Sequence, residues 1–155
     1  MPSLNNNNMR KVITYLTLLL LVSICGNAYG QRKFELNDLD KLYSLTDPQI
    51  SPDGKSVLLV ASKPDTGTNK NKSFIYKVDA STGVTQQLTF ERASVSFPRW
   101  SPSGNAVAFI SADAVGKGQI FVLSMNGGEA KKITASPTGV QQFNWSPDGN
   151  SFAFT

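Results

Sequence analysis

The side chains that most often carry enzyme chemistry are sparse in these 155 residues. The chain has no histidine, and Cys25 is its one cysteine. Without histidine, a Ser-His-Asp triad cannot be assembled from these residues alone, and no Gly-x-Ser-x-Gly elbow is present. Metal sites would lack imidazole ligands, and no carboxylates have the spacing of a calcium-binding loop. The sequence therefore predicts no catalytic residue, no cofactor-binding residue and no metal ligand.

The remaining polar groupings favour structural roles. Asp38 and Asp40 would lie on a helix face, and Asp47 and Asp53 bracket a turn, so neither pair is expected to act as a catalytic acid and base. Gly127-Gly128 is followed by no helix, which indicates a hairpin turn rather than a phosphate-binding loop.

One phrase occurs three times and organises the chain. It reads Ser-Pro-(Asp/Ser)-Gly at residues 51–54, 101–104 and 146–149. Proline presets φ for the first corner of a tight turn, and glycine permits a positive φ at its end. The apolar run at residues 106–110 is short enough to be a strand buried on both faces. Ser51 and Ser101 are 50 residues apart, and Ser101 and Ser146 are 45 apart, which is typical of propeller blades.

The segments between the turns repeat as well. Residues 74–89 and 119–134 each predict an apolar strand, a glycine turn and a second strand that ends in Leu-Thr or Ile-Thr. The five extra residues of the first period fall in the polar stretch 63–72, which we expect to be an exposed hairpin tip. Trp100 and Trp145 occupy equivalent positions and are expected to pack between blades.

The N-terminal 30 residues have the pattern of a secretory signal peptide. Arg10 and Lys11 precede an apolar run, and small residues allow cleavage between Gly30 and Gln31. Met9 is an alternative start. The apolar run is shorter than the ~20 residues of a membrane span, so no stable span is expected after cleavage. A lipoprotein signal would place a small residue just before the lipidated cysteine. Because Ile24 precedes Cys25, lipidation of Cys25 is not expected.

Residues 31–47 are predicted to be a linker and a short amphipathic helix. Asn37 is a plausible cap and Asp47-Pro48 would end the helix, whose apolar face would consist of Leu36, Leu39, Leu42 and Leu45. Residues 48–155 are then an incomplete propeller with blades at 48–97 and 98–142 and part of a third at 143–155. Because a propeller needs at least four blades, we expect this chain to be a fragment of a longer protein.

The charge of the mature chain is close to balanced. Removing Arg10 and Lys11 with the signal leaves 13 basic and 11 acidic residues, a net charge of +2. No basic stripe interleaves with aromatic residues, so nucleic acid is not an expected partner. Lys70, Lys72 and Lys77 are interpreted as a solvated loop and strand edge.

The order of these features resembles one family. Residues 34–39 running into 45–55, with Asp-Pro-Gln-Ile-Ser-Pro-Asp-Gly, look like the start of secreted peptidases of the prolyl oligopeptidase family, in the acylaminoacyl-peptidase and dipeptidyl-peptidase-like branch. The likeness continues through residues 87–89 and 96–102 and covers residues 34–155. TolB-like periplasmic propellers share the Ser-Pro-Asp-Gly and Leu-Thr phrases. The expected fold is therefore an all-β, partial propeller of about two and a half TolB/WD40-like blades.

The resemblance implies a partner and a substrate class. In that family an N-terminal propeller caps a C-terminal α/β-hydrolase domain, which carries the catalytic Ser, Asp and His and hydrolyses peptides. None of those three residues maps onto this sequence. The paired glutamates of the dipeptidyl branch are absent as well, because Glu35, Glu91 and Glu129 are isolated. Endopeptidase, dipeptidyl peptidase and acyl-peptide hydrolase activities therefore stay open.

Three hypotheses follow for function. The first is the substrate-gating, non-catalytic propeller of a secreted serine peptidase. The alternative is a TolB-like periplasmic propeller that binds proteins and has no enzyme activity. The third is a propeller enzyme of another chemistry, such as a lyase or quinoprotein, whose ligands would lie in further blades. All three place the mature protein outside the cytoplasm, in the periplasm or the medium.

Overall fold

The structure is a computed structural model that describes residues 9–17, 35, 38, 41–65, 67–90, 92 and 94–155. The chain divides into two compact units, Met1–Phe34 and Glu35–Thr155. In the first unit, residues 9–17 form a helix with exposed apolar side chains such as Val12 and Leu16. Cys25 and the predicted cleavage site after Gly30 lie outside the described residues. No helix in the described ranges has both the length and the apolar character to cross a membrane.

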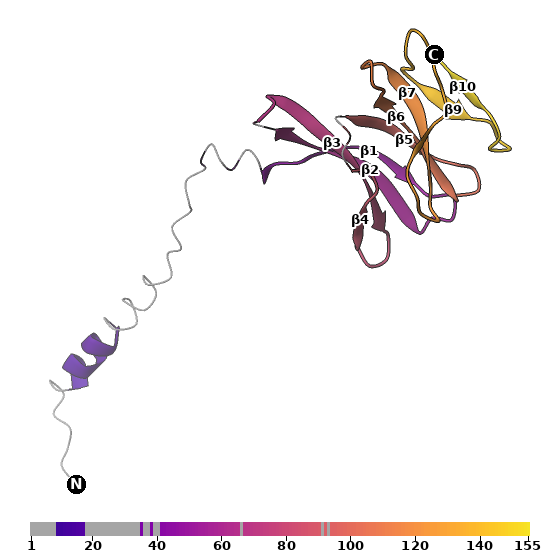
Figure 1. The fold of residues 1–155 in the computed structure, drawn as a ribbon. Helices are drawn as coiled ribbons and strands as arrows, with labels where there is room; N and C mark the ends of the chain where they lie inside the picture. Colours follow the sequence, from indigo (N-terminus) through magenta and orange to yellow (C-terminus); the bar gives the residue numbers. More distant parts are fainter. Residues whose placement is uncertain are drawn as a thin grey trace. The chain divides into compact units, whose positions relative to one another are not determined.

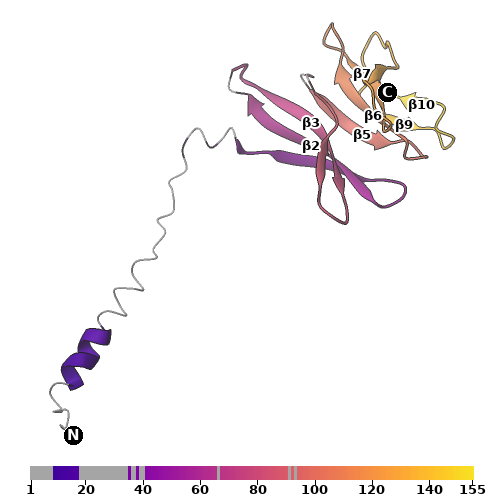
Figure 2. The same cartoon turned by 60° about the horizontal axis from the view of Figure 1, so that its bottom comes forward.

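The described part of the second unit is built from antiparallel strands, which confirms the predicted all-β fold (Figures 1 and 2). Two four-stranded sheets, which we call the first and second blades, have the orders β1-β2-β3-β4 and β5-β6-β7-β8, and β9 pairs with β10 in the third. The strands are β1 (Ser44–Ile50), β2 (Ser56–Asp65), β3 (Lys70–Asp79), β4 (Thr85–Gln87), β5 (Val95–Trp100), β6 (Ala106–Ala112), β7 (Gly118–Ser124), β8 (Lys131–Lys132), β9 (Phe143–Trp145) and β10 (Phe152–Phe154).

The core lies between successive blades. Leu58 and Ile75 of the first blade pack with Phe109 and Phe121 of the second, and the same cluster includes Val95. A second cluster joins the second and third blades through Ile120 and Phe143, among others. Strand β6 contributes to both clusters because its alternate side chains point to opposite faces, as the apolar run at 106–110 predicted.

The two tryptophans join the first strands of neighbouring blades. The Trp100 indole nitrogen donates to the carbonyl of Gln49 at 3.2 Å, and that of Trp145 donates to the carbonyl of Arg99 at 3.3 Å. Gln49 and Arg99 occupy equivalent positions in β1 and β5. The expectation that the tryptophans pack between blades is therefore confirmed.

The predicted helix over residues 36–47 is wrong at its C-terminal end. Leu45 pairs with Ala61 in the β1–β2 ladder, and both Leu42 and Leu45 are exposed. Residues before a proline are disfavoured in helical geometry, and pairing with β2 satisfies the backbone of β1 instead. Leu36, Asn37 and Leu39 lie outside the described residues.

The first strands of the blades begin earlier than residues 48 and 98. Register shifts between Thr46 and Gln49, and between Ser96 and Arg99, place Pro48 and Pro98 within bulges. A bulge interrupts the regular hydrogen bonds of the ladder, so a proline without an N–H fits there and the strand continues. Consequently β1 begins at Ser44 and β5 at Val95.

The stretch 63–72 is mostly strand rather than loop. Strand β2 continues to Asp65 and β3 begins at Lys70, where the two residues pair with each other, so the connection between the strands is short. The Lys72 ammonium lies 2.8 Å from the Asp65 carboxylate, which links the two strands close to that connection. The extra residues of the first period therefore lengthen a hairpin ladder.

Candidate functional site

The serine of each Ser-Pro-x-Gly turn closes that turn from within. The hydroxyl oxygens of Ser51, Ser101 and Ser146 accept hydrogen bonds from the backbone N–H five residues later, at 2.9, 3.1 and 2.9 Å. In the first turn the Ser51 hydroxyl also donates to Asp53 at 2.6 Å, and the Asp53 carboxylate accepts from the Lys55 N–H. The phrase is therefore a hydrogen-bonded turn that a glycine with positive φ completes.

Successive turns lie side by side. A Cβ placed on Gly104 would lie 3.6 Å from Cδ of Pro52, and one placed on Gly149 would lie 3.5 Å from Cδ of Pro102. The proline of one turn thus lies beside the glycine of the next. Three repeats of one phrase therefore stabilise both the single turn and the contact between neighbouring blades.

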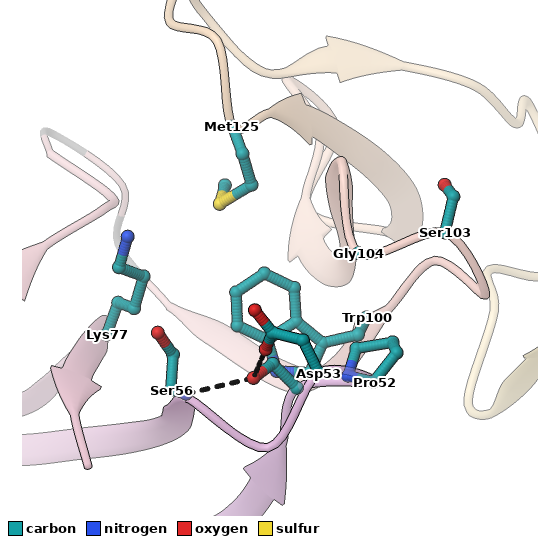
Figure 3. A pocket seen from close by; sticks show the side chains of 9 residues that line it. Pro52, Asp53, Ser56, Lys77, Trp100, Ser103, Gly104 and Met125 are labelled. Atoms are coloured by element: carbon teal, nitrogen blue, oxygen red, sulfur yellow. Dashed lines mark hydrogen bonds between the residues drawn. The ribbon is translucent and has the colours of Figure 1, made fainter. Parts of the chain in front are cut away.

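A pocket lies beside the first pair of turns, between the first and second blades (Figure 3). Its volume is about 400 Å³. In Figure 3 the Trp100 ring stands in the middle, with Lys77 on one side and Ser103 and Gly104 on the other. The lining residues combine a cation, a carboxylate, hydroxyls and apolar side chains: Ser51, Pro52, Asp53, Ser56, Lys77, Trp100, Ser103, Gly104 and Met125.

The two charged groups of this pocket differ in how they are held. The hydrogen bond from the Ser51 hydroxyl, followed by that from the Lys55 N–H, lowers the pKa of Asp53, so its carboxylate is ionised at neutral pH. Asp53 is thus part of the turn. Lys77 lies in β3, pairs with Leu58 of β2 and is half-buried.

A second polar cluster joins the bulges of β1 and β5. One terminal nitrogen of Arg99 lies 3.0 and 2.9 Å from the two carboxylate oxygens of Asp47, and the guanidinium carbon lies 3.6 Å from the centre of the Phe97 ring. Asp47 and Phe97 occupy equivalent positions and have φ values of 52° and 57°. Such values are costly for residues other than glycine. The ion pair and the ring contact hold both bulges in this conformation.

The other groupings singled out in the sequence are not brought together as reactive sites. Asp47 binds Arg99 whereas Asp53 binds Ser51. Asp38 pairs with Lys41 at 2.9 Å, and Asp40 lies outside the described residues. Gly127 and Gly128 have positive φ in the turn between β7 and β8, as a hairpin requires. In the part of the chain that the structure describes, no three His, Cys, Asp or Glu residues are grouped to hold a metal.

The prediction that Lys77 lies at a solvated strand edge is wrong. Strand β3 pairs with β2 on one side and β4 on the other, so Lys77 lies in the interior of the sheet and lines the pocket. The repeat alignment carries the signal that identifies it. The equivalent residue 45 positions later is Val122, which pairs with Ala108 as Lys77 pairs with Leu58. A lysine therefore stands where the second blade has an apolar residue.

The turns should make stability depend on acid pH. Hydrogen bonds lower the folded-state pKa of Asp53 and of Asp148, in each case with the turn serine as the largest cause. Their stabilisation is therefore complete above the unfolded pKa of about 3.9 and is lost as pH falls through the folded-state values. We expect the urea midpoint to fall between pH 5 and pH 2.5. An Asp53→Asn/Asp148→Asn variant should show a shallower fall, and an equal slope would contradict this assignment.

Stacked four-stranded antiparallel sheets, joined by the same turn in every repeat, define a β-propeller. The model of one family, described as the TolB β-propeller domain (PD40), matches residues 36–155. The chain belongs to this family.

The chain is similar to proteins named as peptidases and to one named as a putative TolB. The uncharacterized peptidase YuxL of Bacillus subtilis is 37% identical over 94 residues, which are 61% of this chain and 14% of YuxL. The acylaminoacyl peptidase of Pyrococcus horikoshii has a TM-score of 0.63 at 23% identity, over 76% of this chain and 18% of that one. A putative TolB of Agrobacterium tumefaciens has a TM-score of 0.57 at 27% identity, over 73% of this chain and 38% of that one. The predicted resemblance to peptidase propellers is confirmed, and this chain spans a small part of each of these proteins.

Proposed function

We propose that this chain is the substrate-gating, non-catalytic propeller portion of a secreted serine peptidase of the prolyl oligopeptidase family. The observation that carries the proposal is the 37% identity with YuxL, a protein named as a peptidase, over 94 residues of the propeller sequence. The 155 residues contain no histidine, so a Ser-His-Asp triad needs a further domain. The proposed partner is a C-terminal α/β-hydrolase domain of the same polypeptide, and the proposed substrates are peptides.

An active-site probe tests this proposal on the native product. We expect a fluorophosphonate, which labels activated serines, to mark a polypeptide that contains these residues and is much longer than 155 residues. Sequencing past codon 155 should then show more blades, a Gly-x-Ser-x-Gly elbow and later Asp and His codons. The 155-residue chain expressed alone should not be labelled. A native product without a probe-reactive serine would refute the peptidase assignment.

Gating has a separate readout on the active native protein. A propeller that restricts access should allow rapid cleavage of short peptides while folded proteins carrying the same sequence are spared. Equal cleavage of both substrates would leave the peptidase assignment standing and would refute the gating role.

A protein-binding propeller without enzyme activity is the second candidate. It is supported by the family model, which is described as a TolB domain, and by the 27% identity with the Agrobacterium TolB. This candidate predicts a reading frame that ends once the blades close, with no hydrolase sequence after them. Affinity capture from the periplasm should then recover a stoichiometric protein partner.

Export is part of both candidates. Residues 1–30 are proposed to be a signal peptide, supported by the basic start and the apolar run that follows it. Intact-mass analysis of the secreted or periplasmic protein should place the mature N-terminus at Gln31. A mature protein that retains residues 9–30 would show that this segment is not cleaved.

A further inference from the structure

The repeats allow each interface between blades to be compared with the next. Trp100 and Trp145 donate equivalent hydrogen bonds across the two interfaces, and equivalent turns lie beside them. Residues that the architecture requires should therefore recur in both places. A residue that differs in chemical class between equivalent positions is better explained by a role that only one interface has.

Lys77 is such a residue. Its counterpart Val122 packs with Trp145 and Phe152 against the cluster between the second and third blades. Lys77 faces the second blade from the same position of the ladder, beside the buried Leu58. The aliphatic stem of Lys77 can pack as valine does, but its ammonium group needs water or a polar partner, and the pocket of about 400 Å³ lies here. Ser56, which also lines the pocket, has Ala106 as its counterpart in the second blade.

The groups around this pocket specify the chemistry of a ligand. Lys77 and Ser56 supply side-chain hydrogen-bond donors, whereas their second-blade counterparts Val122 and Ala106 have none. Among the described residues, no ion pair includes the Lys77 ammonium group. Trp100 and Met125 supply an apolar wall. Asp53 also lines the pocket and differs from its second-blade counterpart Ser103, but its carboxylate already accepts hydrogen bonds from the Ser51 hydroxyl and the Lys55 N–H. The donors Lys77 and Ser56, together with the apolar wall, therefore suit a carboxylate attached to an apolar group.

We propose that the pocket between the first two blades binds a carboxylate with an apolar substituent, such as the C-terminal residue of a peptide that ends in a hydrophobic side chain. Lys77 binds the carboxylate through its ammonium group, and Ser56 donates a second hydrogen bond. The apolar side chain lies against Trp100 and Met125. This site goes beyond the proposed function because binding requires neither a catalytic domain nor peptide hydrolysis.

The test uses N-acetylleucine as the probe and N-acetylleucinamide as its uncharged match, titrated into the purified protein. The indole N–H signals of Trp100 and Trp145 in an NMR spectrum of the native protein, assigned by Trp100→Phe and Trp145→Phe variants, report on the two interfaces. We expect the acid to shift the Trp100 signal in a saturable manner and to leave the Trp145 signal in place. The amide should bind at least about tenfold more weakly, because it cannot form the charge-assisted hydrogen bond.

Lys77→Val gives this position the residue that the second blade has, and it should weaken binding of the acid by about tenfold or more. Lys132→Val removes a charge from an exposed strand position and is the matched control, with unchanged binding expected. If Lys77→Val fails to fold, Lys77→Gln serves in its place. Equal binding of acid and amide, binding unaffected by the Lys77 variants, or no saturable shift of Trp100 would each overturn the proposal.

Discussion

Replacing Phe109 by alanine should lower the free energy of unfolding by about 3–5 kcal/mol, the usual cost of truncating a buried aromatic residue. Phe109 is fully buried. Its ring stacks on Phe121 with 6.0 Å between centroids, in the same cluster as Leu58 and Ile75 of the first blade. The truncation therefore opens a cavity at the contact between two blades. Because a whole domain is stable by only ~5–15 kcal/mol, the variant should be partly unfolded at 37 °C.

Urea denaturation monitored by tryptophan fluorescence measures this effect. Phe90→Ala is a matched control because the Phe90 side chain is 63% exposed, and its variant should change stability by less than about 0.5 kcal/mol. Phe109→Leu keeps most of the volume and should cost less than about 1.5 kcal/mol. A loss below about 1 kcal/mol for Phe109→Ala would mean that the contact between the blades contributes little to stability.

The sequence was sufficient to predict the repeated architecture because its signals are local. The Ser-Pro-x-Gly turn needs only its own serine, proline and glycine, and the apolar run at 106–110 defines a buried strand without reference to distant residues. The period then follows from the spacing of the turns. These features come from short-range interactions that are repeated along the chain.

The predictions that are wrong concern residues whose local structure depends on pairing with a strand that is distant in the sequence. Leucines three residues apart favoured a helix, but Leu45 pairs with Ala61 and belongs to β1. The bulge at Asp47 and Pro48 allows β1 to continue, and the Asp47 carboxylate in this bulge is bound by Arg99, which lies 52 residues further along the chain. Composition near residue 47 contains no information about that arginine. The residue type of Lys77 predicts a solvated side chain, whereas its position in the β2–β3 ladder determines that it lines a pocket.

Gly118 and Ser73 show how two blades meet one packing requirement in different ways. In the first blade the Ser73 hydroxyl accepts from the Val95 N–H at 2.7 Å and donates to the Val95 carbonyl at 2.9 Å. At the equivalent place in the second blade, the Val140 N–H donates directly to the Gly118 carbonyl at 2.8 Å. The Ser73 side chain therefore bridges its strand to Val95 in the first blade. In the second blade Gly118 has no side chain, so the backbone of Val140 can approach and bond to it directly.

Gly118→Ala should therefore destabilise the protein by about 1–3 kcal/mol, the range for overpacking a filled site. A Cβ at Gly118 would lie 2.8 Å from the Val140 carbonyl oxygen and 3.2 Å from Ile110 Cγ2. Val140 and Ile110 are buried in one cluster, so neither can move away without loosening the contact with the third blade. The φ of Gly118 is not in the left-handed region, so the predicted cost is steric and does not come from backbone strain.

Gly67→Ala makes the same chemical change where the added Cβ would meet one atom, at the ordinary distance of 3.5 Å. That variant should be neutral or slightly stabilised, because alanine restricts the unfolded chain. Urea midpoints of the two variants and the parent protein separate the steric cost at Gly118 from the general effect of replacing glycine. If both variants matched the parent, the Val140 segment would be free to withdraw from β7. The hydrogen bond between Val140 and Gly118 would then contribute little to the joining of the second and third blades.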